Sequence, residues 1–115
     1  MITKNIIENY SIPPEQEYAI YLYNFETQYS NFSFIFDTHL ANSGKILIEF
    51  YTFIVENETI FLDTEPYYTK EIAKYSPSYQ TSLILIPTPP KTCIKIKNKM
   101  NAEITIKKLI QHYEL

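Results

Sequence analysis

The stretch TCIKIKNKMNAEITIKKLI, residues 92–110, decides the fold. Isoleucines alternate with polar residues twice within it, first at Ile94 and Ile96 and again at Ile104 and Ile106. Successive side chains of a β-strand point to opposite faces, so we expect the isoleucines to face a core and the intervening lysines to face outward. Because the polar segment KNKMN separates the two runs, the pattern predicts an antiparallel hairpin.

Further runs rich in aromatic and β-branched residues lie upstream, separated by polar turn-formers. Together they give seven predicted strands: Tyr18–Glu26, Phe32–Asp37, Lys45–Val55, Thr59–Asp63, Ser82–Pro87, Thr92–Lys97 and Ala102–Ile110. The runs around Tyr21 and Ile48 are apolar on both faces, so we expect them to be covered from both sides or to meet a partner subunit. The sequence therefore predicts an all-β, antiparallel β-sandwich.

The composition fits one such domain. The chain has 115 residues, of which 45% are hydrophobic and 16% aromatic, with one glycine and one cysteine. The lone cysteine excludes a small secreted framework held by internal disulfides. No apolar run reaches the roughly 18 residues of a spanning helix, and the start MITKNIIENY lacks the order of a secretory signal. We expect a soluble chain, made inside the cell, with no membrane span.

The first 17 residues differ from the rest of the chain. A proline pair at residues 13–14 forces an extended or turning path. The three isoleucines before it, which fit one turn of a helix, are Ile2, Ile6 and Ile7. A helix this short is marginal in water unless it packs against something. We therefore expect an N-terminal arm over residues 1–17 and a β-sandwich domain over residues 18–115.

One long connection, Thr64–Thr81, interrupts the strand series and holds a predicted helical turn at Thr69–Tyr75. Its four tyrosines are Tyr67, Tyr68, Tyr75 and Tyr79. Tyrosine rings stack on sugars or unpaired bases, and they are also enriched where proteins meet. Both uses stay open, with packing over the sandwich end or against a second chain preferred. The arm isoleucines and these tyrosines form the predicted partner interface.

Charge is unevenly distributed. The net charge is −3, with −7 over residues 1–90 and +4 over residues 91–115. The chain has no arginine, which disfavours bidentate reading of DNA bases. The C-terminal lysines are solvated outer residues of strands or, alternatively, a basic surface for non-specific nucleic acid contact. They are Lys91, Lys95, Lys97, Lys99, Lys107 and Lys108.

Residues for catalysis are sparse. Cys93 could act as a nucleophile with His39 or His112 as base, but no nucleophile motif surrounds it, so we expect a semi-buried strand cysteine. The two histidines lack partners at zinc-ligand spacing, and the single glycine, Gly44, leaves no Gly-rich phosphate loop. We predict no catalytic residue, no metal and no cofactor.

The order of these elements resembles that of single jelly-roll capsid and penton proteins of viruses. An arm, seven or eight short strands, one long loop and the closing strands SLILIP, TCIKIK and AEITIKKLI carry the resemblance, which spans Tyr18–Ile110 and includes no residue motif. In that family the sandwich tiles a shell through its flanks and loops, and arms tie neighbouring subunits together.

The resemblance implies a non-enzymatic structural subunit of a virion, made in the host cytoplasm. Such a subunit forms homo-oligomers and contacts other structural proteins, here through the arm and the tyrosine-rich loop. The alternative is a β-sandwich binding module that recognises a glycan or a host protein with residues 67–79. A small enzyme that uses Cys93 is a third hypothesis.

Overall fold

The computed structural model describes residues 2–24, 28–74 and 79–114, with all of their side chains except those of residues 28 and 79–82. These residues form nine strands: β1 (Ile2–Ile12), β2 (Glu17–Tyr23), β3 (Gln28–Asp37), β4 (Gly44–Glu56), β5 (Thr59–Leu62), β6 (Tyr68–Ala73), β7 (Tyr79–Thr88), β8 (Lys91–Met100) and β9 (Ile104–Tyr113). The described residues contain no helix, and so none that could cross a membrane. The all-β prediction is confirmed.

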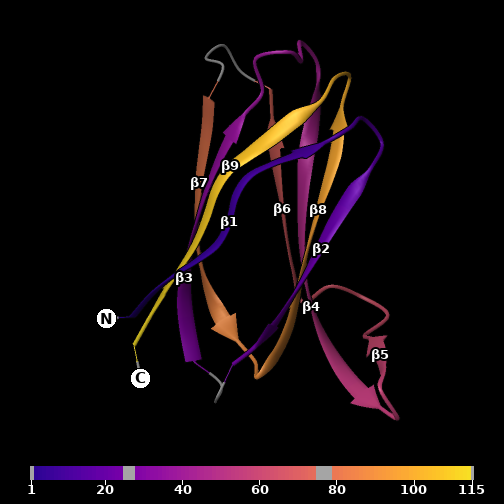
Figure 1. The fold of residues 1–115 in the computed structure, drawn as a ribbon, viewed down its shortest axis with the longest axis vertical. Helices are drawn as coiled ribbons and strands as arrows, with labels where there is room; N and C mark the ends of the chain where they lie inside the picture. The colour runs from indigo at the N-terminus through magenta and orange to yellow at the C-terminus, as the bar shows by residue number, and fades with distance from the viewer. Residues whose placement is uncertain (1, 25–27, 75–78, 115) are drawn as a thin grey trace.

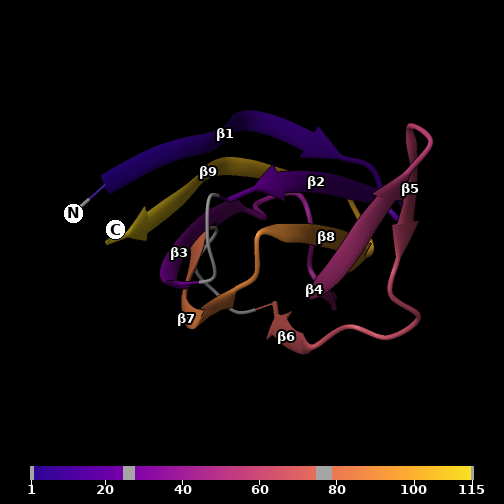
Figure 2. The ribbon, with the colours of Figure 1, turned by 90° about the horizontal axis from the view of Figure 1, so that it is seen from below.

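The strands form two antiparallel sheets that lie face to face (Figures 1 and 2). The first, named here the β1 sheet, has the order β1-β9-β3-β7. The second, the β4 sheet, has the order β2-β8-β4, with β5 and β6 both paired to β4. The predicted antiparallel β-sandwich is therefore confirmed.

Strand pairing is nested along the chain. β1 pairs with β9, β2 with β8, β3 with β7, and β4 with β6. The chain thus runs as one long antiparallel ribbon that turns back at the β4–β5 hairpin, which extends beyond the sandwich in Figure 1. Two further pairings, β3 with β9 and β4 with β8, join the halves of the ribbon and wind it into two layers (Figure 2).

The core lies between the two sheets. Three phenylalanines of β3, at alternate positions, are fully buried and face isoleucines from the opposite sheet. The largest fully buried side chains are Phe32, Phe34, Phe36, Phe50, Ile12, Ile46, Ile48, Ile84, Ile94, Ile96, Met100 and Ile104. The predicted inward orientation of Ile94, Ile96, Ile104 and Ile106 is confirmed.

The predicted hairpin between residues 92–97 and 102–110 is wrong. β8 pairs with β2 and β4, whereas β9 pairs with β1 and β3, so the two strands belong to different sheets. Their isoleucines meet across the core instead of side by side. The period-two pattern shows which face of a strand is buried. A hairpin within one sheet and two strands in facing sheets bury the same face, so the pattern does not distinguish them.

The structure also corrects the predicted N-terminal arm. Residues 2–12 form β1, an edge strand of the β1 sheet, and Ile7 and Ile12 are part of the core. The sandwich therefore begins at β1 rather than at Tyr18, and the segment with the three isoleucines is a strand rather than the single helical turn that they would also fit. The pairing register shifts between Asn5 and Ile7, which interrupts the alternation by which a strand is recognised.

The predicted helical turn at Thr69–Tyr75 is replaced by β6 over its described part. β6 pairs with β4 from Lys45 to Phe50, and its Ile72 side chain is buried in the core. Charged side chains interrupt the alternation of apolar and polar residues in this short strand, so the sequence does not predict it. β6 pairs along one edge of β4, so within the described residues the long connection lacks a strand between β5 and β6.

Strand β4 is buried on both faces over part of its length, whereas the outer face of β2 stays exposed at Tyr21 and Tyr23. Their inner sides face the core, and a second cluster lies on the outer side of the β4 sheet, where Tyr51, Phe53 and Cys93 are buried. The Phe53 ring meets Tyr21 and Tyr23 edge-on, with ring centroids 5.4 Å apart in each pair. The expected cover on both sides is therefore met within one subunit for the run around Ile48 and not for the run around Tyr21.

Candidate interaction surface

The largest exposed apolar group on the β1 sheet belongs to β7 and its neighbour β3. Leu83 and Leu85 are 64% and 62% exposed, and Tyr29 is 67% exposed. In the pairing register Tyr29 lies opposite Pro87, and Leu85 lies opposite Asn31. These residues form one outward-facing patch, named here the β7 patch.

β7 is also the last strand of its sheet, so one side of its backbone has no neighbouring strand in the described part of the chain. All ten of its residues lack charge, although charged side chains are a common protection of sheet edges. Its register with β3 is uninterrupted from Gln28 to Asp37. A long, regular and uncharged edge is the kind to which another strand adds.

Pro87 shows which backbone groups face this open edge. A proline has no N–H, so within a sheet it occupies positions whose N–H side faces away from the ladder. The Pro87 carbonyl accepts a hydrogen bond from the Tyr67 hydroxyl, at 3.3 Å, across from the other sheet. Since these directions alternate along a strand, Leu83 and Leu85 also direct their N–H and C=O groups to the open edge.

The other sheet edges carry protection that β7 lacks. β1 has a register shift and the charged residues Lys4 and Glu8. β6 carries Lys70 and Glu71, and Glu71 forms an ion pair with Lys45. At the edge of β2, the Tyr18 ring stacks on Tyr10 of β1, with centroids 4.0 Å apart, and closes that side of the sandwich.

A hollow of about 370 Å³ adjoins the β7 patch on the outer face of the β1 sheet. Its lining combines apolar and polar side chains of β3, β7 and the end of β9: Tyr29, Asn31, Leu85, His112, Tyr113 and Glu114. The His112 ring lies 3.1 Å from the Thr3 hydroxyl, measured at Nδ1, which joins β1 to this surface. The β7 patch is thus continuous with a polar depression.

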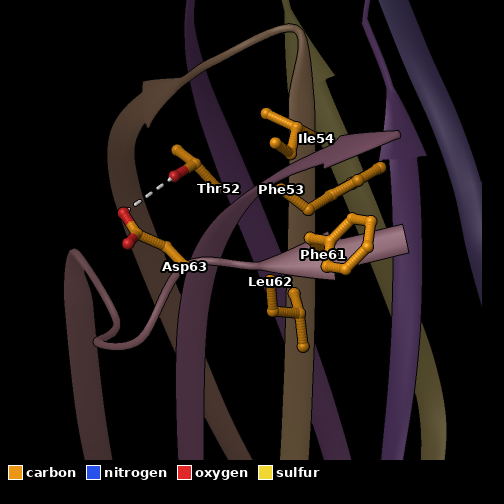
Figure 3. A pocket seen from close by; sticks show the side chains of 6 residues that line it. All are labelled: Thr52, Phe53, Ile54, Phe61, Leu62 and Asp63. Atoms are coloured by element: carbon orange, nitrogen blue, oxygen red, sulfur yellow. Dashed lines mark hydrogen bonds between the residues drawn. The ribbon is translucent and has the colours of Figure 1, made fainter. Parts of the chain in front are cut away.

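A second hollow, of about 320 Å³, lies at the β4–β5 hairpin (Figure 3). It is lined by Thr52, Phe53, Ile54, Phe61, Leu62 and Asp63. Phe61 and Ile54 are half-exposed, and the Thr52 hydroxyl donates to the Asp63 carboxylate at 3.3 Å. The turn residues Asn57 and Glu58 both have positive φ, which suits the tight two-residue turn of this hairpin.

The structure separates the two halves of the predicted partner interface. The β1 isoleucines lie at one lateral side of the sandwich, where β1 adjoins β2, and β6 lies at the opposite side next to β7 (Figure 2). Ile7 is buried in the core, and Ile2 and Ile6 are half-buried. Ile7 and Ile6 therefore contribute to the packing of the sandwich.

Of the described tyrosines of the long connection, one packs against the core and one is partly exposed. Tyr68 packs against the core beside Phe50, with ring centroids 5.9 Å apart, whereas Tyr67 is 39% exposed. Tyr75 and the side chain of Tyr79 lie outside the described residues. The β7 patch was not predicted as an interface, although the uncharged run SLILIP could have indicated it.

The predicted basic surface is divided between the sheets. Lys91, Lys95, Lys97 and Lys99 lie on β8 in the β4 sheet, and Lys107 and Lys108 lie on β9 in the β1 sheet. Three of the β8 lysines have acidic partners, at the N–O distances 3.7 Å for Lys95–Glu17, 2.7 Å for Lys97–Glu49 and 3.2 Å for Lys99–Glu15. These pairs reduce the positive potential that a nucleic acid backbone would meet.

Cys93 lies under the outer cluster of the β4 sheet. It is fully buried, and burial raises the pKa of its thiol despite the nearby Lys95 ammonium. A protonated and enclosed thiol is a poor nucleophile. The described residues hold no group of three or more His, Cys, Asp or Glu side chains placed to bind a metal ion.

The chain matches no protein-family model, and no curated protein matches it.

Proposed function

We propose that the protein is a non-enzymatic structural subunit that assembles with copies of itself, of the kind that builds a viral capsid or penton. The observation that carries the proposal is the open β7 edge, which joins uncharged backbone to exposed leucines. Exposed apolar patches rimmed by polar residues mark association sites in soluble proteins. Contacts with other structural proteins of the same particle would use the remaining flanks of the sandwich.

The nested strand pairing supports a jelly-roll winding. A jelly roll is a double-sheet sandwich of eight strands, and here eight strands pair first with last and inward in order, with β5 as an extension of the hairpin. Because the same winding also occurs in lectin domains, it supports a capsid-type subunit only together with the assembly surface.

Native mass spectrometry and electron microscopy of the purified full-length protein test this proposal. We expect a defined oligomer with closed symmetry that forms as the concentration rises. A protein that stays monomeric from micromolar to millimolar concentration would contradict the proposal.

The hairpin hollow favours a second candidate function, recognition of a glycan. Carbohydrate sites combine an aromatic face with polar groups that fix orientation, and Phe61 and Asp63 supply both among the lining residues of the hollow (Figure 3). Titration with a panel of oligosaccharides tests this function. Binding that is lost in Phe61→Ala and kept in Val55→Ala, an exposed hairpin residue outside the lining, would support it.

A further inference from the structure

We propose that β7 pairs with β7 of a second copy, antiparallel and about a two-fold axis at Ile84, so that two β1 sheets continue into one eight-stranded sheet. The inference rests on the proposed function, which it deepens by naming the strand, the partner and the register.

The backbone of β7 can form hydrogen bonds with a second copy of the strand. Leu83 and Leu85 direct their N–H and C=O groups to the open edge, as argued from Pro87. When two such strands run antiparallel with Leu83 opposite the partner's Leu85, each of these residues exchanges two hydrogen bonds with its counterpart. The two-fold axis then gives four such bonds, none of which needs the missing N–H of Pro87.

The leucine side chains of β7 favour a second copy of the same strand as the partner. Leu83 and Leu85 stand on the outer face, so the same register sets each leucine beside a leucine of the other copy. The four leucines then lie side by side in one strip, continuous with Tyr29 of each subunit, and each loses part of its exposed surface to its neighbours. A strand of any sequence could satisfy the backbone, but a second β7 also matches this leucine pattern.

The lack of charged residues in β7 also favours pairing with its own copy. Like charges placed opposite each other across a two-fold axis repel, and most edge strands carry such charges. β7 has no charged residue from Tyr79 to Thr88, so it meets its own copy without repulsion. The charged residues of β1 and β6 make those edges poorer partners for the leucine strip.

A proline scan of the full-length chain tests the pairing. Leu85→Pro removes an N–H that faces the open edge and leaves the ladder with β3 intact, as Pro87 already does. We expect this variant to keep the far-ultraviolet circular dichroism spectrum of a folded sandwich and to weaken the dimer at least tenfold in sedimentation experiments. The matched control, Leu40→Lys, changes an equally exposed leucine in the β3–β4 loop and should leave association unchanged.

Cysteine cross-linking tests the register and covers the case in which Leu85→Pro fails to fold. Mixed Leu83→Cys and Leu85→Cys variants should form an intermolecular disulfide with each other faster than either forms with itself. Residues directly opposite lie within disulfide reach, whereas the same residue in both copies is offset.

The outcomes separate the two proposals. A wild-type protein that never associates overturns both the assembly and the β7 pairing. An oligomer that withstands Leu85→Pro in a folded variant, or cross-linking without preference for the mixed pair, overturns the β7 pairing and leaves the structural subunit standing on another interface.

Discussion

The Lys97 ammonium on β8 lies 2.7 Å from the Glu49 carboxylate on β4, measured from Nζ to Oε1, on the outer face of the β4 sheet. The side chains are only 27% and 11% exposed. Lys95, on the same face, lies between Glu17 and the Tyr51 ring, with its ammonium 5.2 Å from the ring centroid. Two of the six lysines of the predicted basic surface, Lys95 and Lys97, are therefore engaged in joining β2, β8 and β4.

Replacing Lys97 with methionine should destabilise the fold. The variant keeps the aliphatic stem but leaves a nearly buried carboxylate without its counter-ion, which costs about 1–3 kcal/mol in the free energy of unfolding. Urea denaturation measures the loss. Lys108→Met, at an exposed position on β9, is the control and should change stability by less than about 0.5 kcal/mol. Equal stability of the two variants would show that the ion pair contributes nothing.

The same pair should make the protein lose stability at alkaline pH. The hydrogen bond to Glu49 raises the pKa of Lys97 above its ordinary value of 10.5. Its contribution is thus complete below about pH 10.5 and is lost as the pH rises through the folded-state pKa. Burial also raises the pKa values of Tyr21 and Tyr51, which act in the same direction. Thermal melting between pH 8 and pH 11.5 should show a shallower decline for Lys97→Met than for the wild type.

Sequence reasoning succeeds where one face of a strand is uniformly apolar. The alternating isoleucines Ile94, Ile96, Ile104 and Ile106 are buried as expected, and each of the seven predicted runs overlaps a described strand. What fails is the partner of each strand, since Ile94 and Ile104 are buried equally well in a hairpin or across a core. Non-local pairing of β1 with β9 leaves no local pattern at all, and the register shift near Ile7 removes the usual one.

The surface was less predictable than the core for a related reason. The exposure of Leu83 and Leu85 depends on β7 being the last strand of its sheet, and the order of strands cannot be obtained from alternation. Likewise, the acidic partners of Lys97 and Lys99 come from β4 and from the turn before β2, far away in the sequence. Spatial neighbours of this kind decide whether a lysine run is a free basic surface.

Substitution of Gly44 should disrupt the junction of β4 and β8. Gly44 has a φ of +99°, and a Cβ added there would lie 2.6 Å from the Met100 Cα, in a backbone that cannot yield locally. Gly44→Ala therefore combines backbone strain with a steric clash and should cost more than about 2 kcal/mol in the free energy of unfolding. Ser43→Ala, at the exposed preceding residue, is the control for chemical denaturation. A Gly44→Ala protein as stable as Ser43→Ala would contradict the close approach.

The thiol of Cys93 should react only when the sandwich opens. It is fully buried under Tyr51 and Phe53, and burial raises its pKa, so both access and the thiolate fraction are low in the folded protein. Labelling with a chromogenic disulfide reagent should be slow in buffer and immediate in denaturant. A Leu40→Cys variant, whose added thiol is exposed, should label one site at once and Cys93 slowly. Prompt labelling of Cys93 in the folded wild type would contradict its enclosure and would renew the hypothesis of an enzyme that uses this thiol.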